Sequence, residues 1–185
     1  MLKNVWKFIK NPVYKTYKDA TPAYKARIFF SLLSLNLFFG IGIVVLNEGL
    51  ITLLELDMGD HASESLMDSY SPLIIFFLIV IAAPLLEELF FRGPLIFFKH
   101  HPHFRFYFYA SAILFGFVHF FNFEFSLPAL LMAPLLVAPQ LIMGFFLGYI
   151  RVKLGLRWSI LLHASHNGIL MIPLLLTKVM DIPAV

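Results

Sequence analysis

Long apolar runs separated by short polar segments dominate the pattern along this chain. Five runs are each long enough to cross a bilayer, which takes about 20 apolar residues in a helix. They cover roughly residues 28–54, 72–98, 104–121, 127–150 and 158–176. The runs are continuous, whereas the strands of a membrane barrel would alternate apolar and polar residues. We therefore predict an all-α, polytopic integral membrane protein with about five transmembrane helices.

The charges between the runs indicate how these helices are oriented. The loops after the first and third runs carry acidic residues without Lys or Arg, whereas those after the second and fourth carry Lys and Arg. Lys and Arg concentrate in cytoplasmic loops, so this alternation predicts a cytoplasmic N-terminus and a C-terminus on the opposite side. We expect a multi-pass protein of a prokaryotic plasma membrane.

Residues 1–27 form a basic segment ahead of the first run. They hold seven of the fourteen Lys and Arg residues and a single acid, Asp19. Binding to nucleic acid is one interpretation of such a segment. We favour the other, a segment at the cytoplasmic membrane surface that contacts anionic lipid, because Trp6, Phe8 and Ile9 can enter the interface. The chain then divides into this interfacial segment and a single membrane domain, residues 28–185, with no nucleic-acid partner.

Two adjacent glutamates, Glu87 and Glu88, interrupt the second run, and Arg92 follows. A carboxylate near the centre of a bilayer costs about 2.5 kcal/mol or more to insert, so two in tandem indicate a function. On a helix Glu88 and Arg92 share a face and can form an ion pair, whereas Glu87 points about 100° away. The spacing therefore predicts a structural pair, Glu88 and Arg92, and a free carboxylate, Glu87, which is a candidate general base.

Few other ionisable groups lie inside the runs. Apart from Arg105, which belongs with the basic loop at the start of the third run, they are Glu48 in the first, His119 in the third, and His163 and His166 in the fifth. Asn167 comes four residues after His163, so these two side chains share a helix face. Because polar groups in a membrane need partners, we expect the second, third and fifth runs to enclose a buried polar cavity. A carboxylate with histidines can activate water as a general base, or bind a metal ion.

Three short patterns fit the motifs of one family of membrane proteases. EELFFR, from Glu87 to Arg92, fits EExxxR; FGFVH, from Phe115 to His119, fits FxxxH; HASHN, from His163 to Asn167, fits HxxxN. Each motif is weak by itself, but all three occur in order and each within a predicted span. The chain thus resembles the type 2 CAAX prenyl protease and bacteriocin-processing family, known as CPBP or Abi, over residues 72–176. That range would be the protease-like core.

The resemblance implies an intramembrane endopeptidase that hydrolyses a peptide bond near the membrane. By its motifs, Glu87 and His119 would orient and deprotonate the attacking water, while His163 and Asn167 would donate hydrogen bonds to the oxyanion. The ion pair of Glu88 and Arg92 would hold the second span in place. The substrate would be a peptide or protein at the lipid surface, and a prenylated CAAX protein, a leader peptide and a bacteriocin precursor all fit.

The motifs leave the need for a metal ion open. The chain has no cysteine and no HExxH helix, which excludes a thiolate site and a zincin site. Glu87, His119 and His163 can still ligate a zinc ion with water in the fourth position. We favour a mechanism without a cofactor, because Asn167 suits an oxyanion hole better than a set of metal ligands.

Two other classes of function use the same residues. A non-catalytic membrane scaffold, such as a bacteriocin-immunity protein, would keep the fold without the chemistry. A proton relay or transporter would use the Glu and His side chains as a pathway. The complete set of motif residues favours catalysis over a scaffold, and a relay would not need Asn167 beside His163.

Overall fold

The computed structural model describes residues 1–59 and 67–180, and most of these residues are helical. Five helical segments are long and apolar enough to cross a membrane: Pro22–Leu53, Pro72–Ile96, Phe104–Asn122, Leu127–Leu154 and Leu156–Val179. This confirms the predicted all-α membrane fold and its five spans. A short helix, α1 (Leu2–Lys10), precedes them.

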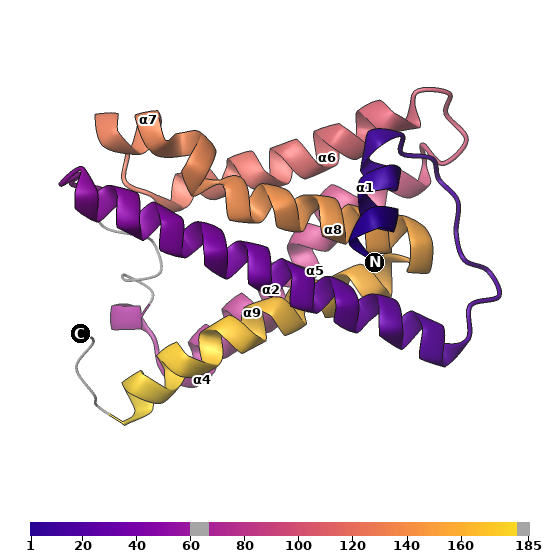
Figure 1. Cartoon of the computed structure of the whole chain (residues 1–185). Coiled ribbons are helices and arrows are strands. Elements are labelled where there is room, and N and C mark those ends of the chain that lie inside the picture. Colours follow the sequence, from indigo (N-terminus) through magenta and orange to yellow (C-terminus); the bar gives the residue numbers. More distant parts are fainter. Residues whose placement is uncertain (60–66, 181–185) are drawn as a thin grey trace.

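Consecutive spans run in opposite directions along the bundle (Figure 1). The first is α2 (Pro22–Leu53), and the third is α6 (Phe104–Val118) extended by η4 (His119–Asn122). The fourth combines α7 (Leu127–Leu136) with α8 (Ala138–Leu154), and the fifth is α9 (Leu156–Val179). We call the end with residues 97–103 the basic end and the end with residues 54–59 the acidic end. The loops thus alternate between the ends as their charges predict.

The second span is irregular and does not form a single regular helix. It consists of α4 (Pro72–Phe76), a π-helical turn η1 (Phe77–Ala82), α5 (Ala83–Glu87), a second π-helical turn η2 (Glu88–Arg92) and a 3-10 turn η3 (Gly93–Ile96). Proline lacks an N–H group and crowds the preceding turn, and here each wide turn directly precedes the helical segment that contains Pro84 or Pro94. Such π-turns are frequent at functional sites. Glu87 and Glu88 lie at the junction of α5 and the second wide turn.

The helix α8 lies at the centre of the bundle, where it packs against α2, α6 and α9. Two glycines on α8 let α6 approach closely. A Cβ atom at Gly144 would lie 3.0 Å from the carbonyl oxygen of Ala112, and one at Gly148 would lie 2.6 Å from Cε2 of Phe108. This small-xxx-small spacing is typical of close contacts between membrane helices.

The N-terminal segment is docked on the basic end of the bundle (Figure 1). The Phe8 ring contacts the rings of Phe108 and Tyr149 edge-on, with centroid distances of 5.1 and 5.3 Å. Phe8 is buried, so its predicted place in the membrane interface is wrong, whereas Trp6 is exposed and free to contact lipid. Further along, the Tyr17 amide donates to the carbonyl of Lys153. Residues 1–27 therefore pack against the helices of the membrane domain.

Candidate active site

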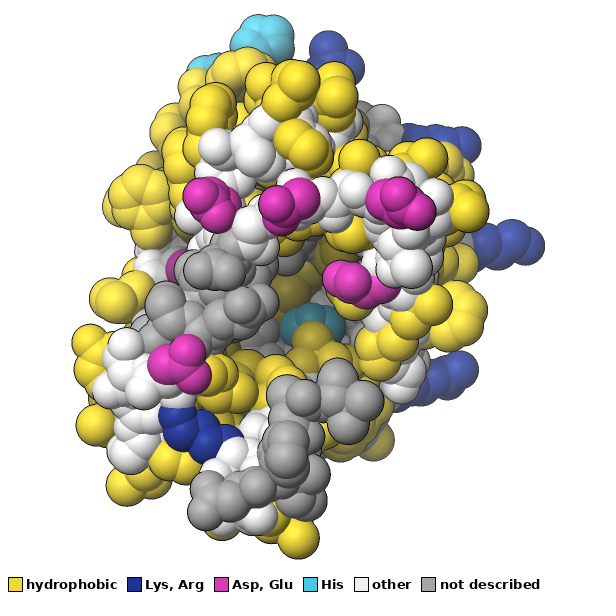
Figure 2. Space-filling model, turned by 90° about the vertical axis from the view of Figure 1, so that its left-hand side faces the viewer, with side chains coloured by type: hydrophobic (Ala, Val, Ile, Leu, Met, Phe, Trp, Pro, Cys, Tyr) yellow, Lys and Arg dark blue, Asp and Glu magenta, His cyan; other side chains and the backbone are white. Residues whose placement is uncertain are grey.

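A cavity of about 570 Å³ lies between all five spans, nearer the acidic end. Figure 2 views the molecule from that end and shows a hollow with a histidine at its base and acidic side chains at its edge. Among the residues that the structure describes, the exposed acidic ones at this end are Glu48, Glu55, Asp57, Asp68 and Glu124. The polar residues that line the cavity are Glu87, His119, Asn122, Gln140, His163, His166 and Asn167. The four residues predicted as catalytic thus line one cavity, as the cost of exposing them to lipid requires.

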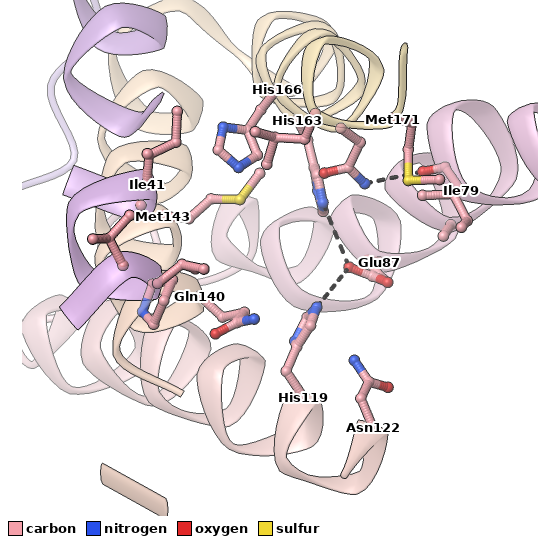
Figure 3. A pocket seen from close by; sticks show the side chains of 17 residues that line it. Ile41, Ile79, Glu87, His119, Asn122, Gln140, Met143, His163, His166 and Met171 are labelled. Atoms are coloured by element: carbon pink, nitrogen blue, oxygen red, sulfur yellow. Dashed lines mark hydrogen bonds and ion pairs between the residues drawn. The ribbon is translucent and has the colours of Figure 1, made fainter. Parts of the chain in front are cut away.

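The Glu87 carboxylate faces two imidazole rings from two other helices (Figure 3). Its Oε2 atom lies 3.7 Å from Nε2 of His163 and 4.0 Å from Nε2 of His119. Both distances exceed that of a direct hydrogen bond, and Oε2 has no hydrogen-bond partner among the described residues. A water molecule can therefore bridge the carboxylate and an imidazole.

The other nitrogen of each of these rings has an oxygen partner. Nδ1 of His119 lies 2.8 Å from the carbonyl oxygen of Phe115, and Nδ1 of His163 lies 3.2 Å from Oε1 of Glu88. Because a carbonyl and a carboxylate only accept, Nδ1 is the donor in both contacts. In the neutral ring Nε2 then presents a lone pair toward Glu87. Three acceptor atoms face one point, where a water molecule, a proton or a cation is the complementary group.

Glu88 lies behind this point and is completely buried. Its Oε1 forms an ion pair of 3.0 Å with Arg92, which is also completely buried, and it accepts from His163 as well. The Ser159 hydroxyl donates to the second oxygen, Oε2. The ion pair is the one that the four-residue spacing predicts, but the same carboxylate also holds the His163 ring.

Arg92 is enclosed by three further groups. Its guanidinium lies 3.9 Å from the centroid of the Phe115 ring, and its Nη2 donates to the carbonyl of Gly144 at 3.3 Å. The Arg151 side chain donates to the Arg92 carbonyl at 2.9 Å. The second span is therefore tied to both α6 and α8 directly after the two glutamates.

Asn167 and His166 occupy the α9 wall of the cavity. Asn167 donates one N–H of its amide to the carbonyl of Ile79 at 2.9 Å, which leaves the second N–H of that amide available. Nδ1 of His166 lies 3.2 Å from Nδ2 of Asn36, a buried residue of α2. His166 thus belongs to the site, although the HxxxN motif does not include it.

The structure adds polar residues that the sequence reasoning did not assign to the site. Asn122 and Gln140 line the cavity, while Asn36 and Ser159 hold His166 and Glu88 from behind. Ser159 could have been found, because it lies one helical turn before His163 on the same face. Asn36 is harder to identify from the sequence than Ser159, because it is a single amide in the apolar run of α2 with no motif residue near it. Glu48 is exposed and lies outside the cavity lining.

A metal ion in the cavity would need several donor atoms close together. Within residues 1–59 and 67–180, no three His, Asp or Glu side chains are grouped closely enough to hold one. Glu87, His119 and His163 converge but stand wider apart than ligands do. A zinc ion on these three residues therefore remains a prediction.

Comparison with known proteins gives one match. Residues 69–169, more than half of the chain, match the model of a family described as type II CAAX prenyl endopeptidase Rce1-like. The matched range contains all three motifs, including His119 on η4 and His163 on α9, the two histidines that face Glu87. Neither a curated protein nor a solved structure matches the chain. On the family match, the chain belongs to the Rce1-like family of type II CAAX prenyl endopeptidases, which are CAAX-type intramembrane proteases.

Proposed function

We propose that this protein is an intramembrane endopeptidase that hydrolyses a peptide bond of a membrane-associated peptide or protein, using water activated by Glu87 and His119. The family supports protease activity in general. The observation that carries the mechanism is the position of Glu87, whose Oε2 faces Nε2 of His119 and of His163 inside a cavity. A general base takes a proton from the attacking water, and a carboxylate and an imidazole at this separation can bind and deprotonate one water molecule.

The attacking water would lie between Glu87 and His119. Hydrogen bonds of about 2.8 Å to both groups are compatible with the 4.0 Å gap between Oε2 and Nε2. Because both atoms are acceptors, the water donates its two hydrogens to them and directs a lone pair toward the substrate carbonyl. Its oxygen attacks the carbonyl carbon while Glu87 takes one proton, and that proton is later delivered to the leaving amine as the C–N bond breaks.

The oxyanion of the tetrahedral intermediate needs donors that are in place before it forms. Asn167 uses one N–H of its side-chain amide for the Ile79 carbonyl, and its second N–H would donate to the oxyanion. His163 donates only when Nε2 carries a proton, as an imidazolium between the carboxylates of Glu87 and Glu88. Removing one such donor costs about a hundredfold or more in kcat in enzymes that depend on it.

The experiment is a cleavage assay with the protein purified in lipid nanodiscs and a library of peptides with and without a farnesylated CAAX end. Glu87→Gln removes the base but keeps the shape, and we expect it to lower kcat by about a hundredfold or more without changing the melting temperature. Glu48→Gln is the matched control, because Glu48 is exposed on α2 and does not line the cavity. Near wild-type cleavage by Glu87→Gln would exclude Glu87 as the base.

The same assay separates the alternatives. A zinc ion held by Glu87, His119 and His163 would act as a Lewis acid and activate the bound water. We expect 1,10-phenanthroline to leave the rate unchanged; loss of cleavage that added zinc restores would establish the metal-dependent alternative instead. Failure of the wild-type protein to cleave any peptide would favour a non-catalytic membrane scaffold.

A further inference from the structure

Three histidines line the cavity, and each has a protein partner at Nδ1. For His119 and His163 that partner is an oxygen, which can only accept. For His166 it is the amide nitrogen of Asn36, at 3.2 Å, which can only donate. The hydrogen-bond partner at Nδ1 determines whether Nε2 of the neutral ring carries the hydrogen or a lone pair. Because the partners differ, the three rings do not all present the same group to the cavity.

His166 must accept at Nδ1, and its ring hydrogen is therefore on Nε2 in the neutral form. The ring atom between the two nitrogens, Cε1, lies 3.7 Å from the position that a Cβ atom at Gly40 would occupy. Asn36 precedes Gly40 by about one turn of α2, so Nε2, on the other side of Cε1, points away from Asn36. Among the described residues no side chain or backbone group pairs with it. His166 thus has an unused N–H donor and lines the cavity.

We propose that His166 is a substrate-binding residue, whose Nε2–H donates a hydrogen bond to a backbone carbonyl of the bound peptide beside the scissile bond. This assignment rests on the proposed peptidase function. His166 follows His163 by one turn of α9, which separates their Cβ atoms by about 5–6 Å. An extended peptide advances about 3.3 Å per residue, so a carbonyl one or two residues from the bond at Glu87 comes within reach of His166.

The surroundings make such a bond effective. The neighbouring wall is apolar, with Ile41 and Val44 from α2 and Met143 from α8. A hydrogen bond in a poorly solvated site is stronger than one in water, and a donor left without a partner there is unfavourable. A peptide carbonyl is the group that satisfies this donor when substrate displaces water.

Asn36 is the positioning residue in this arrangement. It is almost fully buried, with 1% of its surface exposed, and does not line the cavity, so it acts on substrate only through His166. It belongs to α2, which lies outside the range that matches the family, residues 69–169. The helix outside the family match therefore sets the hydrogen-bonding character of a residue within it.

The kinetic test uses the cleavage assay described above. His166→Phe keeps a ring but loses the donor, and we expect KM to rise about tenfold with a smaller change in kcat. His166→Gln restores an N–H group and should recover most of the lost affinity, and Asn36→Leu should raise KM by an intermediate factor. His103→Gln is the control, because His103 is exposed in the loop at the basic end. A wild-type KM for His166→Phe would overturn the proposal.

The tautomer can be measured independently of activity, by nitrogen-15 NMR of histidine-labelled protein with each signal assigned from a single His→Gln variant. We expect His166 to carry its hydrogen on Nε2 and to lose that preference in Asn36→Leu, with the opposite tautomer for His119. A hydrogen on Nδ1 of wild-type His166 would overturn the proposal even if cleavage is observed. Cleavage that Glu87→Gln abolishes but His166→Phe leaves unchanged would reject the role of His166 and retain the peptidase function.

Discussion

Glu88 and Arg92 form an ion pair of 3.0 Å in which neither side chain is exposed. Removing one partner of a buried pair leaves the other charge uncompensated, which costs about 3 kcal/mol or more. We expect Glu88→Gln and Arg92→Met each to destabilise the protein by at least this amount. The double substitution should destabilise less than the sum of the two single changes, because no unpaired charge remains.

The measurement is a double-mutant cycle on unfolding free energies in mixed micelles. A coupling energy near zero would contradict the pairing. His163 offers an internal check, because Glu88 also holds its Nδ1 atom at 3.2 Å. Glu88→Gln should therefore impair cleavage in the fraction that remains folded, more than the loss of stability alone explains.

The sequence predicts the features that depend on the spacing of neighbouring residues or on the surrounding lipid. The five spans follow from apolar length, and the contact of Glu88 with Arg92 follows from positions four apart on a helix. The convergence of Glu87 and His119 follows from the cost of exposing polar groups to lipid. None of these inferences needs the packing of distant segments.

What the sequence reasoning missed depends on contacts between segments far apart in the chain. Asn36 lies 130 positions from His166, and Ser159 lies 71 positions from Glu88, so no local pattern pairs them. The sequence predicts Phe8 at the membrane interface, although an aromatic ring beside lysines suits lipid and a protein core equally well. Only the position of the Phe108 and Tyr149 rings decides between the two.

The close approach of α6 and α8 makes a second prediction. We expect Gly144→Ala to destabilise the protein, because the added Cβ would lie 3.0 Å from the Ala112 carbonyl oxygen, a backbone atom that cannot rotate away. It would also lie 3.4 Å from Nη2 of Arg92 and so disturb the ion pair. Gly49→Ala is the control, since nothing lies within 4 Å of its Cβ position and alanine favours a helix by about 1 kcal/mol. Equal melting temperatures for the two variants would refute the tight contact.

The docking of the N-terminal helix makes a third prediction. Phe8→Ala should destabilise the protein by about 3 kcal/mol or more, as expected for the loss of a buried aromatic ring. Trp6→Ala removes a ring of which 58% is exposed and should leave the unfolding free energy nearly unchanged. If Trp6→Ala is instead the more destabilising of the two, α1 does not pack as described.

The last prediction concerns orientation, and the absence of cysteine makes it straightforward to test. Single-cysteine variants can be labelled in intact cells with a maleimide that does not cross membranes. Because the basic loops should be cytoplasmic, we expect Glu55→Cys, exposed at the acidic end, to react, and Lys99→Cys to react only after lysis. The opposite result would reverse the orientation of the whole bundle.

A third variant then reports which side the cavity opens to. Asn122 lines the cavity and ends the η4 turn, close to the acidic end, where Figure 2 shows the hollow. Asn122→Cys should therefore react from the same side as Glu55→Cys, more slowly because the site is partly enclosed. A peptide substrate added from that side should protect it, since peptide and reagent would compete for the same space. Reaction of Asn122→Cys together with Lys99→Cys, only after lysis, would mean that substrate reaches Glu87 from the basic end instead.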